Sequence, residues 1–374
     1  MNAHELGYTQ GKQEGAEEGW KEGYRLGRSE SMLRELPPDP YWKRDISVLY
    51  VSSGIGYPYP PIDEAIAEAL TGLVRKLIIA GPGDPLSSIA MTNSIDLMIA
   101  LNGVVLPAEQ VKSIRDHGIL TAVWFTDDPY YTDWTIDIAP RYDYIFTLEK
   151  TCVELYQRLG CQHVFHLPFA ANPAIFRAKS VPIGYRSDIC FIGTAYWNRV
   201  HMIEKLSKYL SNKRTVIAGS WWDRLNPSAA ALLKDSIRSE EWLSPETTAA
   251  YYNGAKIVIN LHRASDDATI NFNGKQISAV SVNPRSFEIN ACHTLQVMDM
   301  REDVSEHYRT NEEVLCYKSD NELLELLEYY LAHEEERREI AFRGYKRTML
   351  NHTYRHRVHQ MLELVSTTIP AGNG

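Results

Sequence analysis

The residues with the clearest chemical content lie in one short segment, NPRSFE at positions 283–288. Asparagine followed by proline typically starts a helix, because asparagine caps free amides and proline fits the first helical position. The free amides at the N-terminus of a helix can bind an anion, and the guanidinium of Arg285 can add two parallel hydrogen bonds to it. Glu288, about one turn further on, can accept two hydrogen bonds from a diol. The segment therefore suits a nucleotide diphosphate; the alternative is a capped helix with a surface Glu–Arg pair.

A second candidate for phosphate contact lies at positions 190–199, CFIGTAYWNR. A buried strand that ends in Gly193 and Thr194 and runs on into a helix brings the backbone close to a phosphate. One glycine is a weak signal, but Arg199 near the start of the helix strengthens it. These residues predict the second half of an anion site.

A long polar loop, residues 260–284, separates a predicted strand from the helix of Glu288. Loops of this length inside a compact domain are usually functional or mobile. We expect His262, Arg263 and Lys275 to face the cleft if the strand ends there. For His262 the alternative is a structural histidine after a strand, which is the commoner case.

Two adjacent carboxylates, Asp127 and Asp128, follow the predicted strand ILTAVWFT at positions 119–126. A general base must lie within hydrogen-bond reach of the proton that it removes, and the end of a strand facing a cleft would place one there. The alternative is a turn before Pro129. We therefore treat either aspartate as a candidate base.

The elements that must position these residues are buried apolar strands alternating with helices. This alternation predicts parallel sheets covered by helices on both faces. It occurs twice, over residues 45–172 and 185–350, and predicts an α/β protein with two Rossmann-like domains facing a cleft. Ligands of such sheets lie outside the carboxyl ends of the strands. A last helix, residues 351–368, is expected to return to the N-terminal domain.

Residues 1–36 contain a glycine at every fourth position among strong helix formers. The glycines are Gly7, Gly11, Gly15, Gly19, Gly23 and Gly27. Each costs a helix roughly 0.8–1.0 kcal/mol relative to alanine, so a lone solvated helix is implausible. Residues four apart share a face, where a glycine stripe admits a second backbone at close range. We predict a homo-oligomerisation helix; the alternative is a disordered tail.

Composition excludes several classes of protein. The net charge of −9 argues against a general nucleic-acid or anionic-membrane binder. No apolar run approaches the roughly 20 residues that span a bilayer, and the N-terminus has no signal-peptide core. The five cysteines are scattered and odd in number, which favours reduced thiols in a cytoplasmic protein.

Over residues 46–364 the chain resembles the CgeB-like spore-maturation family, which is similar to family-4-type glycosyltransferases of the GT-B fold. The specific motifs are NPRSFE at 283–288 and NHTYRHR at 351–357; FTDDP, YDYIFT, LPFAANPAIF and KIVINLHR support them. The resemblance implies that the C-terminal domain holds a sugar nucleotide and that Glu288 binds the ribose. The paired E-x7-E of the wider superfamily is absent, because Val280 occupies the earlier position. Asn283 and Arg285 are candidates for its role.

The resemblance implies a hexosyltransferase-type enzyme that moves a sugar from a nucleotide diphosphate, with UDP favoured, to a surface glycan or protein. No D-x-D triplet occurs, so we expect no metal and no separate cofactor. Positive side chains would stabilise the leaving diphosphate instead. The alternative is a nucleotide-sugar-binding or assembly protein without turnover. The predicted catalytic residues are Asp127, Asp128 and His262. The predicted donor-binding residues are Gly193, Thr194, Asn198, Arg199, Lys275, Asn283, Arg285, Ser286, Phe287 and Glu288.

Overall fold

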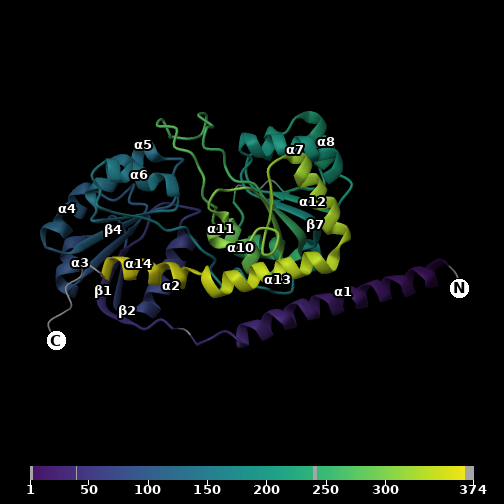
Figure 1. The fold of residues 1–374 in the computed structure, drawn as a ribbon, viewed down its shortest axis with the longest axis horizontal. Coiled ribbons are helices and arrows are strands. Elements are labelled where there is room, and N and C mark those ends of the chain that lie inside the picture. Colours follow the sequence, from purple (N-terminus) through teal and green to yellow (C-terminus); the bar gives the residue numbers. More distant parts are fainter. Residues whose placement is uncertain (1–2, 39, 239–241, 367–374) are drawn as a thin grey trace.

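The computed structural model describes residues 3–38, 40–238 and 242–366. Two α/β domains lie side by side, and a long N-terminal helix runs beneath the C-terminal one (Figure 1). Each domain contains a six-stranded sheet whose strand pairs are all parallel. The fold predicted from the alternation of strands and helices is confirmed.

The N-terminal domain is built on a sheet of strand order β2-β1-β3-β4-β5-β6. The strands are β1 (Arg44–Val51), β2 (Val74–Ala80), β3 (Leu97–Leu101), β4 (Leu120–Phe125), β5 (Tyr144–Thr147) and β6 (His163–His166). The helices are α2 (Pro60–Leu73), α3 (Leu86–Asn93), α4 (Ala108–Asp116), α5 (Thr132–Ile138) and α6 (Lys150–Arg158). A 3-10 turn at Ala139–Arg141 directly follows α5. All five residues of β3 are buried, as expected for a central strand covered on both faces.

The C-terminal domain has strand order β12-β11-β10-β7-β8-β9. The strands are β7 (Ser187–Ile192), β8 (Thr215–Ala218), β9 (Ile237–Arg238), β10 (Ala255–Asn260), β11 (Leu295–Asp299) and β12 (Leu315–Tyr317). The helices between them are α7 (Trp197–Leu210), α8 (Pro227–Leu233), α9 (Pro245–Gly254), α10 (Arg285–Ala291) and α11 (Val304–His307), with 3-10 turns at Ile183–Tyr185 and Trp222–Arg224. The order in which strands are added to the sheet reverses between β7 and β10, so a crevice opens at their carboxyl ends.

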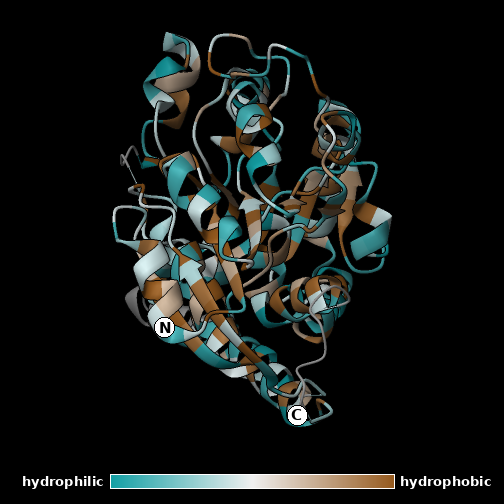
Figure 2. Cartoon of the chain, turned by 90° about the vertical axis from the view of Figure 1, so that its left-hand side faces the viewer, coloured by the Kyte–Doolittle hydropathy of each residue, from teal (hydrophilic) through white to brown (hydrophobic). Residues whose placement is uncertain are grey.

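Three helices end the described chain: α12 (Asp320–Ala332), α13 (Glu334–Asn351) and α14 (Tyr354–Ser366). They lead from the C-terminal domain to the N-terminal one (Figure 1). Val358, Met361 and Leu362 of α14 are fully buried in the core that also contains α2. The strands are mainly hydrophobic, whereas the helices carry hydrophilic residues on their outer sides (Figure 2). This returning helix ties the two domains together across the cleft.

The glycine-rich segment forms one continuous helix, α1 (Ala3–Arg34). Its inner side packs on the C-terminal domain through Met32, which is buried, and through Arg25, whose guanidinium donates to the Cys292 and Lys179 carbonyls at 3.0 Å each. Arg28 pairs with Glu339 at 2.8 Å and lies over the Phe342 ring. These contacts hold the helix in place despite the cost of its glycines.

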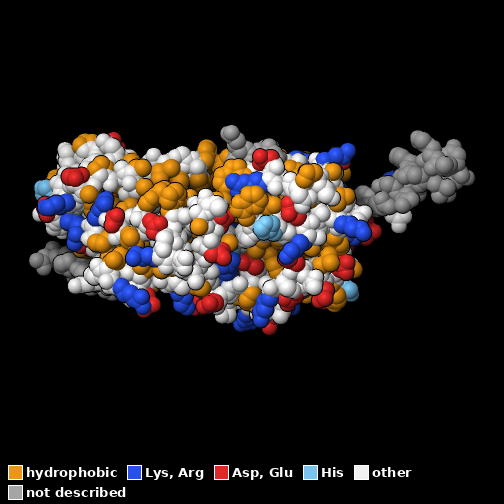
Figure 3. Space-filling model, turned by 90° about the horizontal axis from the view of Figure 1, so that it is seen from above, with side chains coloured by type: hydrophobic (Ala, Val, Ile, Leu, Met, Phe, Trp, Pro, Cys, Tyr) orange, Lys and Arg blue, Asp and Glu red, His pale blue; other side chains and the backbone are white. Residues whose placement is uncertain are grey.

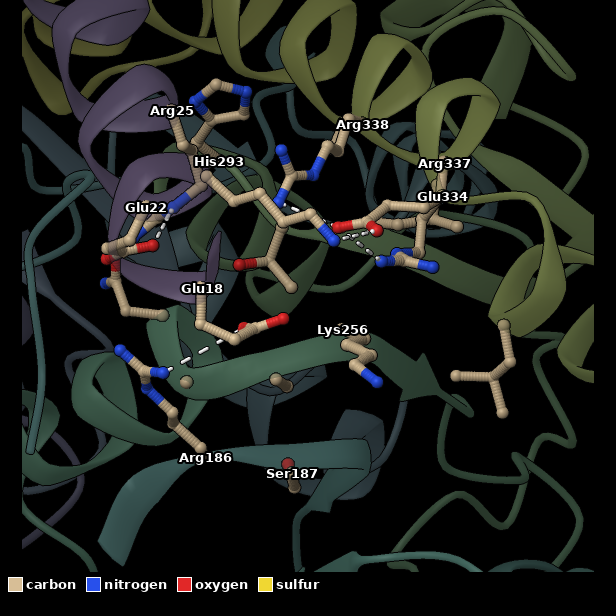
Figure 4. A pocket seen from close by; sticks show the side chains of 18 of the residues that line it. Glu18, Glu22, Arg25, Arg186, Ser187, Lys256, His293, Glu334, Arg337 and Arg338 are labelled. Atoms are coloured by element: carbon tan, nitrogen blue, oxygen red, sulfur yellow. Dashed lines mark hydrogen bonds and ion pairs between the residues drawn. The ribbon is translucent and has the colours of Figure 1, made fainter. Parts of the chain in front are cut away.

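A charged cavity of about 440 Å³ separates part of α1 from the C-terminal sheet (Figure 4). The helix contributes Glu18, Glu22 and Arg25 to the lining of this cavity. The opposite side is lined by Arg186, which directly precedes β7, and by Lys256 of β10. Lys21 of α1 pairs with Glu334 of α13 at 2.8 Å across its edge. This cavity lies at the amino ends of β7 and β10, so it is separate from the crevice at their carboxyl ends. Much of the contact between α1 and the domain is therefore ionic.

The glycine stripe faces away from the rest of the chain at its four later positions, while the surroundings of Gly7 and Gly11 lie outside the described part of the structure. A Cβ atom built on Gly15, Gly19, Gly23 or Gly27 would meet no atom within 4 Å. Trp20 and Tyr24 flank the stripe, stacked at 5.6 Å and largely exposed. The pairing of α1 with a second copy therefore stays a prediction, and the face that it needs is uncovered.

We expect Gly19→Leu or Gly23→Leu to lower the oligomeric state, because the new side chain would block close approach of a second helix. Light scattering measures the mass. Leucine favours helix over glycine and touches nothing in its own chain, so loss of assembly would not reflect a disrupted α1. Gln13→Leu is the matched control, exposed on the same helix but on the side opposite the glycine stripe. An unchanged mass in both glycine variants would contradict the prediction.

Candidate active site

The candidate site is a cavity of about 400 Å³ between the two domains, at the carboxyl ends of β7 and β10. The C-terminal domain contributes Gly193, Arg199, Arg285 and Glu288 to its wall, and the N-terminal domain contributes Asp127. A crevice at this point of a doubly wound sheet is where such folds bind ligands. The predicted residues from both domains therefore meet in one place.

Two arginines form the positive part of the cavity. Arg285 donates to the Ile192 carbonyl at 2.8 Å, and Arg199 donates to the Thr194 carbonyl at 2.9 Å. Both also donate to the Leu261 carbonyl, at 3.2 Å and 3.0 Å. These bonds aim both guanidinium groups at the space beside Gly193, which has room for them only because it lacks a side chain: a Cβ there would lie 2.5 Å from Nη1 of Arg285.

No carboxylate of the described residues forms an ion pair with Arg199 or Arg285. Burial and the neighbouring Arg285 lower the pKa of Arg199 to about 9, which still leaves it protonated at neutral pH. Two uncompensated, partly desolvated positive charges are expensive unless an anion joins them. The pair is therefore suited to bind a diphosphate. Helix α10 has only seven residues, so the arginines, more than the helix start, supply the positive potential.

Glu288 lines the same cavity, half-buried, one turn beyond Arg285. Burial raises the pKa of its carboxyl group to about 7, and the positive charge of Arg285 opposes that shift. No described residue donates a hydrogen bond to this carboxylate, so its oxygens are open to hydroxyl groups of a ligand. The geometry fits the predicted contact with a diol.

The two aspartates after β4 lie in different environments. Asp127 is half-buried at the cavity wall, where Oδ2 accepts from Tyr59 Oη at 2.8 Å and from the hydroxyl of Thr126. Asp128 is 1% exposed and accepts from Tyr156, Thr147 and Thr135, at 2.8, 2.6 and 3.2 Å. Burial raises the pKa of Asp128 to about 6. The geometry therefore favours Asp127 as the candidate base and makes Asp128 an internal anchor.

His262 is 2% exposed, and both of its ring nitrogens are occupied. Nδ1 lies 2.6 Å from Oδ1 of Asp299, and Nε2 accepts the backbone amide of Asn283 at 2.9 Å. Burial lowers the pKa of His262 to about 4, so the ring is neutral at physiological pH. The predicted catalytic role of His262 is therefore replaced by a positioning role: the histidine fixes the backbone that leads into α10.

Comparison with known proteins agrees with this geometry. Residues 199–363 match a family of glycosyl transferase-like proteins. The spore protein CgeB of Bacillus subtilis (strain 168) is 29% identical over 310 residues, which cover 83% of this chain and 95% of CgeB. The chain is therefore similar to CgeB over most of its length and to glycosyl transferase-like proteins over its C-terminal part. The resemblance found in the sequence motifs is thereby confirmed.

Solved structures place the chain in the GT-B fold. Sucrose-phosphate synthase from Thermosynechococcus elongatus superposes with a TM-score of 0.60 at 12% identity, over 88% of this chain and all of that chain. HepE of Anabaena, solved in complex with UDP-glucose, superposes with a TM-score of 0.58 at 8% identity, over 86% of this chain and all of HepE. None of the described helices is long and apolar enough to cross a bilayer.

Four residues predicted to bind the donor lie outside the candidate cavity. Phe287 is fully buried in the core, and Ser286 belongs to a buried polar network with Asn260. The amide of Asn198 donates to the His262 carbonyl at 2.8 Å, so it braces the loop. Lys275 is exposed on the outer part of the long loop. Successive residues of a helix or loop point in different directions, and the motif alone did not separate them.

Several aromatic residues of the cavity wall were missed, among them Tyr59, Tyr252 and Tyr354. Tyr354 comes from the returning helix α14, and Tyr59 comes from the loop before α2. The one feature of the sequence that could have indicated these tyrosines is their position at or near the end of a helix. The NHTYRHR motif did include Tyr354, whose place beside the cavity follows from α14 crossing to the N-terminal domain.

Proposed function

We propose that this glycosyltransferase transfers a sugar from a UDP-sugar to a glycan or protein acceptor, without a metal. The observation that carries the proposal is the pair of arginines without carboxylate partners, Arg199 and Arg285, beside Gly193, with the open carboxylate of Glu288 one turn away. The arginines suit the diphosphate and Glu288 suits the ribose diol. The complex of HepE with UDP-glucose supports a UDP-sugar as the donor.

During transfer the bond between the sugar and the diphosphate breaks, and negative charge grows on the leaving phosphate. Preorganised positive groups at that point lower the barrier. The two guanidinium groups are already held by carbonyls, so little reorganisation is needed when the charge develops. Asp127, across the cleft, would accept the proton of the attacking hydroxyl.

Binding and turnover of UDP-sugars test the proposal. Calorimetric titration with UDP-glucose, UDP-galactose and UDP-N-acetylglucosamine should give saturable binding of at least one. Slow release of UDP without an acceptor should accompany it. Binding without any release of UDP, with or without acceptor extracts, would favour the alternative, a nucleotide-sugar-binding or assembly protein. Failure to bind any nucleotide sugar would overturn both readings.

We expect binding of the UDP-sugar to weaken as the pH falls below about 7. The carboxylate of Glu288 must be ionised to accept both ribose hydroxyls, and burial has raised its pKa to about 7. A raised carboxyl pKa means that the proton competes with the ligand, by about tenfold per pH unit on the acidic side. The diphosphate of a UDP-sugar does not titrate in this range. Calorimetry between pH 5.5 and 8 measures the effect.

Glu288→Gln is the matched control, because it keeps the size of the side chain and cannot ionise. It should bind about 1.5–3 kcal/mol more weakly than the wild type at pH 8. Its affinity should also change little with pH. Equal affinity of the wild type and Glu288→Gln at pH 8, with both proteins folded, would contradict the ribose contact.

A further inference from the structure

The mouth of the cavity is flanked by aromatic side chains, most of which do not line the cavity itself. We call them the aromatic band. The band consists of Tyr131, Trp134 and Phe272 on the N-terminal side and Tyr196, Trp197 and Trp221 on the C-terminal side. These residues come from α5, the loop between β10 and α10, and the starts of α7 and of the 3-10 turn at Trp222–Arg224. Hydrophobic side chains gather on the face of the molecule that is seen from above in Figure 3.

The N-terminal half of the band is a fixed cluster of three rings. Tyr131 stacks on Trp134 at 5.0 Å and on Phe272 at 5.8 Å, and Trp134 lies 4.7 Å from Phe272. Two backbone bonds hold Phe272 against the N-terminal domain, one to the Tyr130 carbonyl at 2.8 Å and one from the Asp133 amide at 3.0 Å. Trp134 is nevertheless 43% exposed and Phe272 49% exposed. The rings are thus rigidly held yet open to solvent.

Arg263 joins the two halves of the band. Its guanidinium carbon lies 4.5 Å from the ring centres of both Tyr130 and Tyr196, and 5.4 Å from that of Tyr131. The side chain is buried, and its Nε has no hydrogen-bond partner among the described residues. Arg263, Tyr130 and Tyr196 also line the donor cavity. The band is therefore continuous with the cavity. At the point where they meet, the Nε–H group of Arg263 is available to donate a hydrogen bond to a ligand.

The C-terminal half continues in the same manner. Tyr196 lies 5.9 Å from Trp221, and the guanidinium of Arg224 lies 4.2 Å from the Trp221 ring and 5.3 Å from the Trp197 ring. Trp197 and Trp221 are 40% and 42% exposed. Rings and guanidinium groups thus alternate from one domain to the other across the cleft mouth.

This pattern has a chemical meaning. Exposed aromatic rings held rigidly next to a cavity indicate a binding surface, because they lose water favourably when a ligand covers them. Sugar rings have an apolar face of C–H groups and a rim of hydroxyls. The C–H face suits the negative face of an aromatic ring, and the hydroxyls suit guanidinium donors. A protein partner would call for a broader apolar patch than a row of single rings.

We propose that the aromatic band is the binding track of a carbohydrate acceptor several sugar residues long, whose end reaches into the cavity beside Asp127. This inference rests on the proposed transfer of a sugar, and it narrows the acceptor from glycan or protein to a glycan chain. The band spans both domains, so a bound chain would also hold the cleft in the arrangement seen here.

Affinity electrophoresis tests the track directly. Native gels contain dextran, hydroxyethyl cellulose, glycol chitin or polygalacturonate as the probe. The wild type should be retarded by at least one of them. The double variant Trp134→Ala/Phe272→Ala and the single variant Trp221→Ala should each bind that polysaccharide at least fivefold more weakly. Trp42→Ala is the matched control, a 72% exposed tryptophan outside the band, and should behave as the wild type.

The inference is overturned if no polysaccharide retards the wild type, or if the band variants and Trp42→Ala are retarded equally. Calorimetry with the UDP-sugar separates this result from the proposed function. The band variants should bind the donor and release UDP as the wild type does, because the altered side chains do not line the cavity. Normal retardation without any donor binding would instead defeat the proposed function and leave the carbohydrate track standing.

Discussion

Arg285→Ala should weaken binding of the UDP-sugar by about 1.5–3 kcal/mol, the value of a hydrogen bond to a charged group. It should lower the rate of transfer by about a further 10²–10³, as loss of one preorganised donor at a developing negative charge commonly does. The reason is its position: the guanidinium is aimed into the cavity by two carbonyls and has no carboxylate partner. Calorimetry and UDP release measure the two effects separately.

The stability of Arg285→Ala provides a second readout. In the wild type the positive charge of Arg285 repels that of Arg199 and lowers the pKa of Arg199. Removing Arg285 therefore removes an electrostatic repulsion from the unliganded protein. It also removes two hydrogen bonds to carbonyls. We expect these effects to offset and Tm to change little. Arg285→Lys keeps the positive charge but loses the paired N–H donors of the guanidinium. It should retain part of the affinity for the UDP-sugar. Arg338→Ala, in the separate cavity beside α1, is the matched control and should leave donor binding unchanged. Wild-type donor affinity in Arg285→Ala would contradict the assignment.

Asp127→Asn should lower the rate of transfer to an acceptor by about 10²–10⁴, the usual effect of removing a general base. Donor binding should stay near the wild-type value, because Asp127 lies on the opposite wall from the arginines. Among the described residues, the hydrogen bonds of Asp127 go to Oδ2 and none goes to Oδ1, so Oδ1 can take a proton from a hydroxyl in the cavity. Initial rates with saturating donor measure the effect.

Asp128→Asn is the paired comparison, and it should act on stability. Its carboxylate accepts hydrogen bonds from three hydroxyl groups, and an amide would turn a donor toward them. A mismatch of this kind in a buried site costs about 1–3 kcal/mol. We expect a lower Tm and a smaller change in rate than in Asp127→Asn. Near-wild-type transfer by both variants would mean that the acceptor base lies elsewhere or that none is needed.

The local spacing of residues predicted which of them would line much of the C-terminal wall of the candidate cavity. Arg285 and Glu288 are three residues apart, so any helix places them on one face, and the Asn-Pro pair marks where that helix begins. Gly193 follows a run of buried residues, which marks the end of a strand. These inferences need only the geometry of single elements, and they hold in the structure. Both domains were predictable for the same reason, since strands and helices that alternate can hardly pack in another way.

Contacts between distant parts of the chain were not predictable in this way. The sequence predicted a catalytic role for His262. In the structure its two ring nitrogens are occupied by Asp299, 37 residues further along the chain, and by the backbone amide of Asn283. Asp127 and Asp128 are identical as neighbours in the sequence. They differ because successive side chains after a strand point to opposite sides, one to the cleft and one to Tyr156. Arg263 meets Tyr130 only because the long loop crosses to the other domain.

The glycine repeat illustrates the same division. By itself the four-residue period determined that any helix formed here would carry a bare stripe of glycines, because side chains four apart share one face, and it left a disordered tail as the alternative. Which side of that helix lies against the protein was decided by tertiary contacts of Arg25, Arg28 and Met32 with the C-terminal domain. Periodicity is a property of neighbouring residues and can be read along the chain. The choice of partner depends on shape and charge across distances that only the folded chain brings together.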